Sequence, residues 1–276
     1  MVRRFGLGRV GDKAGGLAGA VRSEPTMFLG RMDMRKIGGS FVGAGVAAGR
    51  ADMGDLHQND LVFHFRADTG ITEATGVSAW EDQVSGSVTL AQDTAGSQPA
   101  YDATETVGTL ANAGAMTFDG SNDLLSSTSV TVTGQPIHIF FVYKPITWTN
   151  NDSPFSGKGG DTTSCHHMQI TSTPQAGVAS GVDPGGVQNF TLGEWCLAIA
   201  LFNGTSTTLA RNDGTPEGDA DNENLDMAEG FFLGAQAAIV QHANIAVGEL
   251  AIYDVNKTGG DLTDIKDYFN DQYGLW

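Results

Sequence analysis

Short runs of alternating apolar and polar residues, separated by turn residues, follow one another along the chain after residue 60. In residues 61–66 (LVFHFR), Leu61, Phe63 and Phe65 fall on one face of an extended chain and the intervening residues on the other. Further runs, rich in β-branched and aromatic residues, cover 116–119, 137–144, 195–202, 205–211, 231–233 and 248–253. Residues of these types favour strands. The pattern therefore predicts an all-β protein with many short antiparallel strands.

One helix is expected, at the C-terminal end. Apolar residues recur at helical spacing over residues 262–272, Asp261 is suited to the N-cap, and Gly274 is suited to end the helix. The predicted fold class is all-β: a two-sheet antiparallel jelly-roll sandwich with a C-terminal helix and an extended N-terminal arm.

The core of this sandwich is expected to consist of the apolar residues on the inward faces of the strands. The residues predicted to be buried between the two sheets are Phe63, Phe118, Ile139, Phe141, Leu197, Ile199 and Ile252.

The charge of the chain divides it into two parts of opposite sign. Residues 1–50 hold nine basic and three acidic residues, a net charge of +6, whereas the rest holds six and twenty-nine, a net charge of −23. The first part is also rich in glycine, which loses much backbone freedom on ordering. We therefore predict a basic, glycine-rich extended arm over residues 1–56 and one β domain over residues 57–276. The basic residues assigned to assembly are Arg3, Arg4, Arg9, Arg22, Arg31, Arg35 and Lys36.

The acidic body excludes some partners. Phosphates would be repelled by a net charge of −23, so no nucleic-acid partner is expected for the body. No membrane contact is expected, because no stretch approaches the roughly 20 apolar residues that span a bilayer. Residues 37–48, after Arg35 and Lys36, are mostly Gly and Ala and begin too far along the chain for a secretory leader. Cys165 and Cys196 are expected to be free structural thiols.

Several segments occur in an order that resembles the laminin-G-like, concanavalin A-like lectin/glucanase family. They are residues 80–83 (WEDQ), 98–101 (QPAY), 118–123 (FDGSND), 139–145, 248–254 (GELAIYD) and 265–275. The resemblance covers roughly residues 57–276 and implies a two-sheet jelly roll, of the kind found in secreted bacterial proteins and in bacteriophage structural proteins. Because this fold serves many functions, it does not by itself assign one.

Catalysis is not expected from the motifs. Glucanases of that superfamily carry a strand motif Glu-x-Asp-x-x-Glu, which is absent here. Glu249 and Asp254 are five positions apart, on opposite faces of a strand. Cys165-His166-His167 lacks a second cluster with zinc-ligand spacing, so a loop with incidental histidines is the expected reading. The sequence-based prediction is that the protein is not an enzyme.

A run of acidic residues between positions 213 and 226 contains no base. Crowded carboxylates repel one another, and a hard cation such as Ca²⁺ relieves that repulsion. Asp213, Asp219 and Asp221 are the candidate ligands, although Asn224 stands where a calcium loop has its glycine. The alternative is a solvated acidic loop.

Trp148 is followed by Asn150, Asn151 and Asp152, just after the strongest predicted strand, residues 137–144. An aromatic ring beside amides is a common arrangement for binding sugars. The four residues are the candidate carbohydrate site. The alternative is that Trp148 closes one end of the core.

Two functions are compatible with these observations. In the first, the protein is a bacteriophage virion structural protein whose arm contacts other virion subunits and copies of itself, while the lectin-like domain is exposed as a decoration or host-adhesion module that contacts a host surface glycan. The alternative is a secreted, non-catalytic bacterial carbohydrate-binding module. The basic arm favours the first, because a free module has no need of it.

Overall fold

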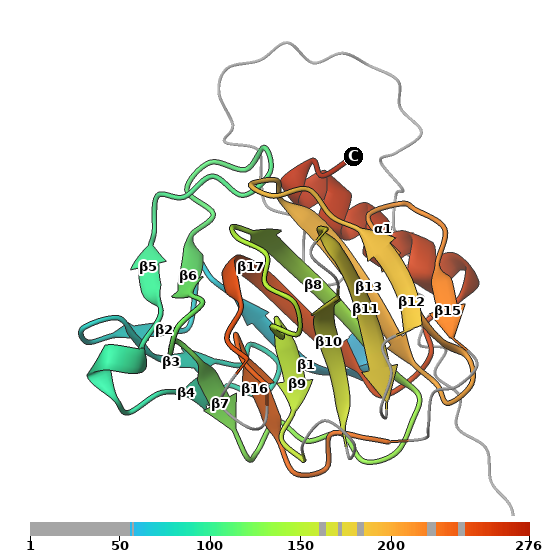
Figure 1. The fold of residues 1–276 in the computed structure, drawn as a ribbon, viewed down its shortest axis with the longest axis horizontal. Helices are drawn as coiled ribbons and strands as arrows, with labels where there is room; N and C mark the ends of the chain where they lie inside the picture. The colour runs from blue at the N-terminus through green and yellow to red at the C-terminus, as the bar shows by residue number, and fades with distance from the viewer. Residues whose placement is uncertain are drawn as a thin grey trace, which may run out of the picture. The chain divides into compact units, whose positions relative to one another are not determined.

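A computed structural model describes residues 56, 58–159, 164–170, 173–180, 185–219, 225–236 and 241–276. The predicted arm lies outside the described residues, apart from Leu56. The described residues form two antiparallel sheets packed as a sandwich, with one C-terminal helix (Figure 1), which confirms the predicted fold class. Two short 3-10 helices, η3 (Gln58–Asp60) and η4 (Ala95–Ser97), complete the described elements.

The first sheet, sheet A, has eight strands, in the order β15-β14-β13-β8-β17-β6-β5, with β1 paired to β17. Its strands are β1 (Leu61–Arg66), β5 (Ala100–Asp102), β6 (Ala115–Asp119), β8 (Ile137–Pro145), β13 (Cys196–Phe202), β14 (Thr207–Arg211), β15 (Glu217–Asp219) and β17 (Asn244–Tyr253).

The second sheet, sheet B, has nine strands, in the order β12-β11-β10-β9-β16-β7-β4-β3-β2. They are β2 (Ile71–Glu73), β3 (Val77–Glu81), β4 (Thr89–Ala91), β7 (Leu125–Ser127), β9 (Phe155–Gly157), β10 (Cys165–Ile170), β11 (Gln175–Ser180), β12 (Gly185–Asn189) and β16 (Phe231–Leu233). Most of these strands are short, so turns and loops form much of the rim.

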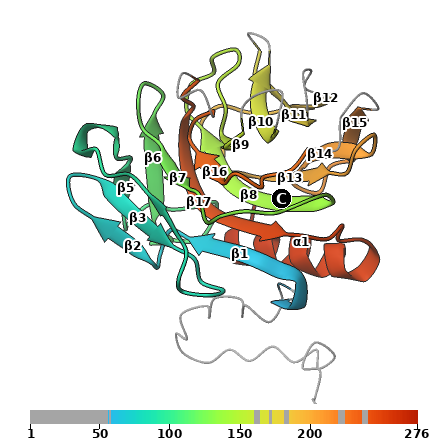
Figure 2. The same ribbon diagram turned by 90° about the horizontal axis from the view of Figure 1, so that it is seen from below.

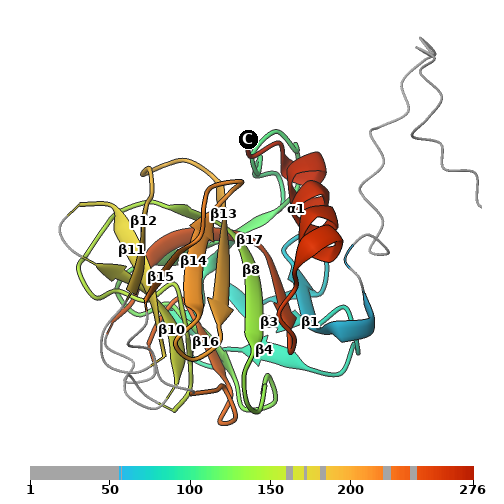
Figure 3. The ribbon, with the colours of Figure 1, turned by 90° about the vertical axis from the view of Figure 1, so that its right-hand side faces the viewer.

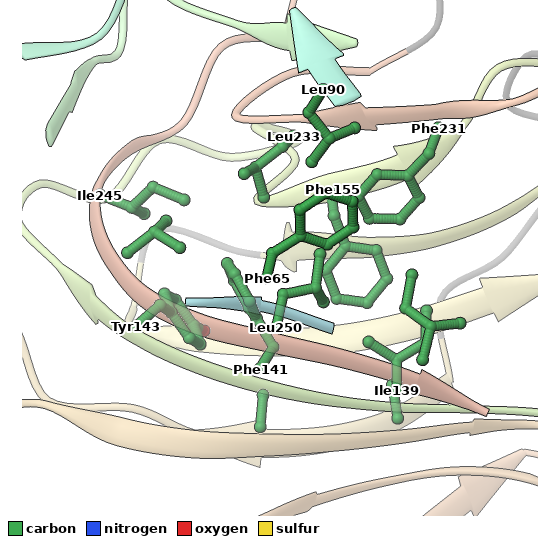
Figure 4. Packing of buried hydrophobic residues seen from close by; sticks show 14 of the residues in the cluster. Phe65, Leu90, Ile139, Phe141, Tyr143, Phe155, Phe231, Leu233, Ile245 and Leu250 are labelled. Carbon is green, nitrogen blue, oxygen red and sulfur yellow. The ribbon is translucent and has the colours of Figure 1, made fainter. Parts of the chain in front are cut away.

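The main core lies between the two sheets, and aromatic side chains dominate it (Figure 4). Phe141 on β8 stacks against Tyr143, with ring centroids 4.8 Å apart, and meets Phe155 of sheet B edge-on at 5.6 Å. Because side chains alternate along a strand, Ile139, Phe141 and Tyr143 face this core while Phe140 faces the other side of sheet A.

The helix α1 (Gly259–Tyr273) covers the outer side of sheet A (Figure 2). A second core of buried side chains lies between the helix and this sheet. Phe269 of the helix stacks on Phe140 of β8, with centroids 5.9 Å apart. Leu197 and Ile199 are buried here, so their predicted place between the sheets is wrong. Their strand, β13, is apolar on both faces. The sequence pattern alone therefore did not show which face of the strand lies toward which core.

The helix is longer than predicted at its N-terminal end. Thr258, not Asp261, is the N-cap residue, and Gly274 ends the helix in the left-handed conformation, with φ of 59°. The amide of Gly274 donates to the carbonyl of Asn270 at 2.7 Å. The first three residues of the helix, Gly259, Gly260 and Asp261, are not apolar, so the apolar periodicity did not locate them.

In the part of the chain that the structure describes, no helix is long and apolar enough to cross a membrane.

Candidate functional site

A hollow with a volume of about 580 Å³ lies on the outer face of sheet B. We call it the sheet-B cleft. Its lining residues come from β7, β16, η4 and loops next to the strands, and are Gln92, Thr94, Ser97, Ser121, Asn122, Leu124, Ser126, Lys158, Phe232 and His242. Eight of these ten side chains are polar and none is a carboxylate, which is unusual on a body with a net charge of −23.

The strand register explains which residues form the floor of the cleft. Phe231 and Leu233 on β16 face the core, so Phe232 between them faces outward. Phe232 pairs with Ser126 on β7 and with Ser156 on β9, and Ser126 pairs with Ala91 on β4. The small neighbours leave a hollow beside the Phe232 ring.

One wall of the cleft is the turn after β6, part of the segment that carried the family resemblance. Asp119 Oδ1 accepts hydrogen bonds from the backbone amides of Ser121 (2.8 Å), Asn122 (3.1 Å) and Asp123 (3.3 Å). Burial raises the pKa of Asp119, but these backbone hydrogen bonds outweigh it, and its pKa is lower than the ordinary value. Gly120 has a φ of 73°, and a Cβ atom added to it would lie 2.8 Å from Cβ of Asn244, so no side chain fits there.

His242 contacts both this turn, through Asp123, and Ser153, which follows the predicted sugar-binding loop. Its Nδ1 lies 3.2 Å from the carbonyl oxygen of Asp123. The Asp123 carboxylate accepts the amide of Asp119 at 3.0 Å, and burial raises the pKa of Asp123 to about 6, with the nearby Asp119 charge adding to the rise. His242 also forms a β-bridge with Ser153, the residue that follows the predicted sugar-binding loop.

That predicted loop does not line the cleft. Trp148 is partly buried against the main core, and its ring stacks on Phe190 with centroids 6.1 Å apart. Asn150 and Asn151 are exposed. The backbone N–H of Asn151 donates to the backbone carbonyl of Gln169 at 2.7 Å. Burial raises the pKa of Asp152. The structure thus brings the loop next to His242 and favours the alternative in which Trp148 closes the core.

The three candidate calcium ligands are not brought together among the described residues. Asp213 pairs with Lys266 at 2.5 Å, while the Asp219 side chain and all of Asp221 lie outside the described residues. Within the described ranges, no group of three or more His, Cys, Asp or Glu side chains is arranged to hold a metal ion.

The Cys165-His166-His167 segment is a strand, β10, and not the expected loop. His167 lies in the main core, where its ring nitrogens are 3.0 Å from the Tyr143 hydroxyl and 3.1 Å from the Gly177 carbonyl. Burial lowers the pKa of His167 to about 4. Cys165 and Cys196 are both buried, and no disulfide joins them in the structure.

A second hollow, the α1 pocket, has a volume of about 380 Å³ and lies between the start of α1 and sheet A. Its apolar wall includes Ile199, Leu201 and Leu262. Its two lysines already have partners, because Lys257 pairs with Asp60 at 2.6 Å and Lys266 with Asp213. The pocket is therefore mostly apolar, with its positive charges neutralised.

Glu249 forms a buried polar cluster of its own. Its carboxylate accepts hydrogen bonds from His64 Nε2 at 2.6 Å, from the Tyr268 hydroxyl at 2.9 Å and from the Tyr273 hydroxyl. Burial raises the pKa of Glu249, but the hydrogen bond and charge of His64 outweigh it and hold this pKa below its ordinary value. The side chain is fully buried, so the cluster joins β1, β17 and α1 and has no access to a ligand.

Sequence reasoning missed most of the cleft. The turn at 118–123 was recognised only as part of a resemblance, and β16 only as a strand. Lys158 and Ser126 carry no local sequence signal. They become neighbours through the order of strands in sheet B, which the sequence does not specify.

No protein-family model matches this chain, and no curated protein matches it. Solved structures share its fold. Domain 4 of AbnA, a GH43 extracellular arabinanase from Geobacillus stearothermophilus in complex with arabinotriose, has a TM-score of 0.54 and 15% identity, over 76% of this chain and 98% of that chain. An arabinofuranosidase complexed with arabinofuranosyl-alpha-1,2-xylobiose has a TM-score of 0.56 and 10% identity, over 77% and 59%.

A sialidase from Trypanosoma rangeli is also similar, with a TM-score of 0.51 and 13% identity, over 77% of this chain. The chain spans only 33% of the length of that sialidase. At these identities the likeness establishes the fold, a β sandwich that occurs in carbohydrate-active proteins.

These structures correct the prediction that the protein is not an enzyme. That prediction depended on the missing Glu-x-Asp-x-x-Glu motif. The named neighbours are a sialidase, an arabinofuranosidase and a domain of an arabinanase, so the fold occurs in glycosidases. The absence of one glucanase motif therefore does not exclude glycoside hydrolysis.

Proposed function

We propose that the β sandwich is a carbohydrate-binding domain and that the sheet-B cleft is its glycan site. The observation that carries the proposal is the lining of the cleft, which combines hydroxyl and amide side chains with an aromatic floor in a hollow of about 580 Å³. Sugars present many hydroxyl groups, which such side chains bind through hydrogen bonds, and sites of this size are typical for small ligands.

The walls of the cleft are held in place before any ligand binds. Asn122 donates its side-chain amide to the carbonyl of Gly96 at 2.8 Å, and Gln92 accepts the amide of Thr94 at 2.9 Å. Preorganised groups lose little freedom on binding, which favours affinity. The arabinotriose complex of the similar arabinanase domain also supports a role in glycan binding.

A pair of variants at one position tests the proposal. Ser126→Trp would fill the cleft, whereas Ser126→Ala keeps it open. Wild type and Ser126→Ala are expected to bind at least one class of glycan on an array, and Ser126→Trp is expected to lose that binding while keeping the wild-type circular dichroism spectrum. Equal binding by all three would contradict the location. Analysis of the bound glycans for released sugars shows whether the domain also hydrolyses them.

A second proposal concerns the arm, and the charge asymmetry of the sequence supports it. A segment with a net charge of +6 is attracted to acidic surfaces such as the −23 body of another copy. We propose that residues 1–56 anchor the protein in a virion, with the sandwich exposed on the particle. Mass spectrometry of purified bacteriophage particles, with the full chain and with a variant lacking residues 1–55, tests this. Normal incorporation of the shortened chain would overturn it.

A further inference from the structure

The described part of the chain contains six basic side chains, and five of them pair with a carboxylate. The pairs are Arg66 with Asp68, Lys144 with Glu105, Arg211 with Glu194, Lys257 with Asp60, and Lys266 with Asp213, at N···O distances from 2.5 to 3.4 Å. Of these six described Lys and Arg side chains, Lys158 is the one that pairs with no described carboxylate. In a body with twenty-nine acidic residues and six bases, this is an unexpected result.

Lys158 lines the sheet-B cleft. It follows β9 directly, and its backbone amide donates to Gly230 at 3.0 Å, next to β16. Its ammonium group lies 5.2 Å from the centroid of the Phe232 ring, within the range of a cation–π interaction. Phe232 is 4% exposed. The ammonium is therefore held near the floor of the cleft.

No lining residue of the cleft is a carboxylate, and the other lining groups are hydroxyls, amides, an imidazole and two apolar side chains. A Lys ammonium offers three donors and no acceptor, so hydroxyls and amide oxygens solvate it without neutralising it. An anion that enters the cleft would meet a cation that no described acid competes for.

We propose that the sheet-B cleft takes a saccharide with an anionic group, a carboxylate or a sulfate, and that Lys158 binds that group. This rests on the proposed function of the cleft. The neutral part of the sugar then meets the amides of Gln92 and Asn122, and its anionic group meets Lys158. Hydrogen bonds between charged groups are shorter and about twice as strong as neutral ones, so this contact would select acidic over neutral sugars.

The α1 pocket is a weaker candidate for an anion. Both of its lysines are paired, so an anion there would have to displace Asp60 or Asp213. The sheet-B cleft requires no such displacement.

The experiment uses the full chain and a glycan array in which neutral glycans are paired with their carboxylated and sulfated counterparts. We expect the acidic member of a pair to bind more tightly, and Lys158→Met to weaken its binding about tenfold or more, which is the usual effect of losing a hydrogen bond to a charged group. Lys158→Arg keeps the charge and should keep the preference. The carboxylated and sulfated arms identify which group is bound.

Lys144→Met is the matched control, because Lys144 also lies over an aromatic ring, 5.0 Å from the centroid of Trp195, but away from the cleft lining. It should leave binding unchanged. If wild type binds neutral and acidic members equally, or if Lys158→Met binds acidic glycans like wild type, the inference is overturned while the proposed function stands. If no glycan is bound, both are overturned.

The wild-type protein gives a second measurement that does not depend on the folding of a variant. Salt screens interactions between accessible charges, so binding of the acidic glycan should weaken as salt is raised. Binding that is independent of salt would also overturn the inference.

Discussion

The carboxylate of Glu249 on β17 lies 2.6 Å from Nε2 of His64 on β1, and neither side chain is exposed. Two tyrosine hydroxyls of α1 donate to the same carboxylate. A single buried anion thus joins β17 and the helix α1 to the strand β1, which is far from both in sequence.

Replacing this anion should destabilise the fold. In Glu249→Gln the amide cannot accept all of the hydrogen bonds, and its own N–H groups meet donors. Breaking a buried pair by removing one partner costs about 3–5 kcal/mol, and we expect a loss of this order in the free energy of unfolding, measured with urea. Asp254→Asn, at the exposed residue just after β17, is the control and should change it by less than about 0.5 kcal/mol. Equal stability of both variants would contradict the role of the cluster.

Stability should also depend on Asp123 between pH 7 and pH 5. Burial raises the pKa of Asp123 to about 6, above its value in the unfolded chain, so the ionised carboxylate opposes folding at pH 7. As the pH falls through 6, the folded state takes up a proton before the unfolded state does, and stability from this group rises.

Asp123→Asn removes that titration and keeps an acceptor for the Asp119 amide. Urea unfolding at several pH values should show wild type gaining stability relative to Asp123→Asn as the pH is lowered. Parallel pH profiles of the two proteins would show that Asp123 does not titrate in this range.

The main core should be sensitive at Phe141. Its ring is fully buried and contacts Tyr143 and Phe155. Phe141→Ala should lower the free energy of unfolding by about 3–5 kcal/mol, the range for deleting a buried aromatic side chain. Val187→Ala on β12 is the control, since Val187 is 41% exposed and should tolerate the change. A small loss at Phe141 would mean that the core relaxes into the space.

A chelator should leave the melting temperature unchanged. Asp213 pairs with Lys266, so this candidate calcium ligand already has a cationic partner. A cation bound only by the folded state would stabilise it by mass action, and its removal would then lower the melting temperature. A clear decrease with excess chelator, reversed by Ca²⁺, would establish a structural calcium site.

Several strands and most of the helix could be predicted because their signals are local, although β10 was expected to be a loop. Residues 61–66 and 231–233 match β1 and β16 at both ends, and residues 137–144 match β8 to within one residue. It was harder to predict which face of a sheet each residue of a strand lies on. Leu197 and Ile199 lie in a strand that is apolar on both faces, and only the position of α1 decides which core they join.

The cleft could not be predicted, because its residues come from positions 92 to 242 and meet only through the order of strands in sheet B. Lys158 illustrates the difficulty. In the sequence it is one base among many acids, and its lack of a carboxylate partner becomes visible only when the partners of the other described bases are known.

The layering of the domain has a practical consequence for anyone who wishes to attach it to a solid support. The helix α1 covers the outer side of sheet A (Figure 3), whereas the lining residues of the cleft lie on the outer side of sheet B. A dye or surface linker coupled to a cysteine introduced at the exposed Asp267 of α1 would lie on the opposite layer from the cleft. Immobilisation through the helix would therefore orient every molecule with its sheet-B cleft toward the solution.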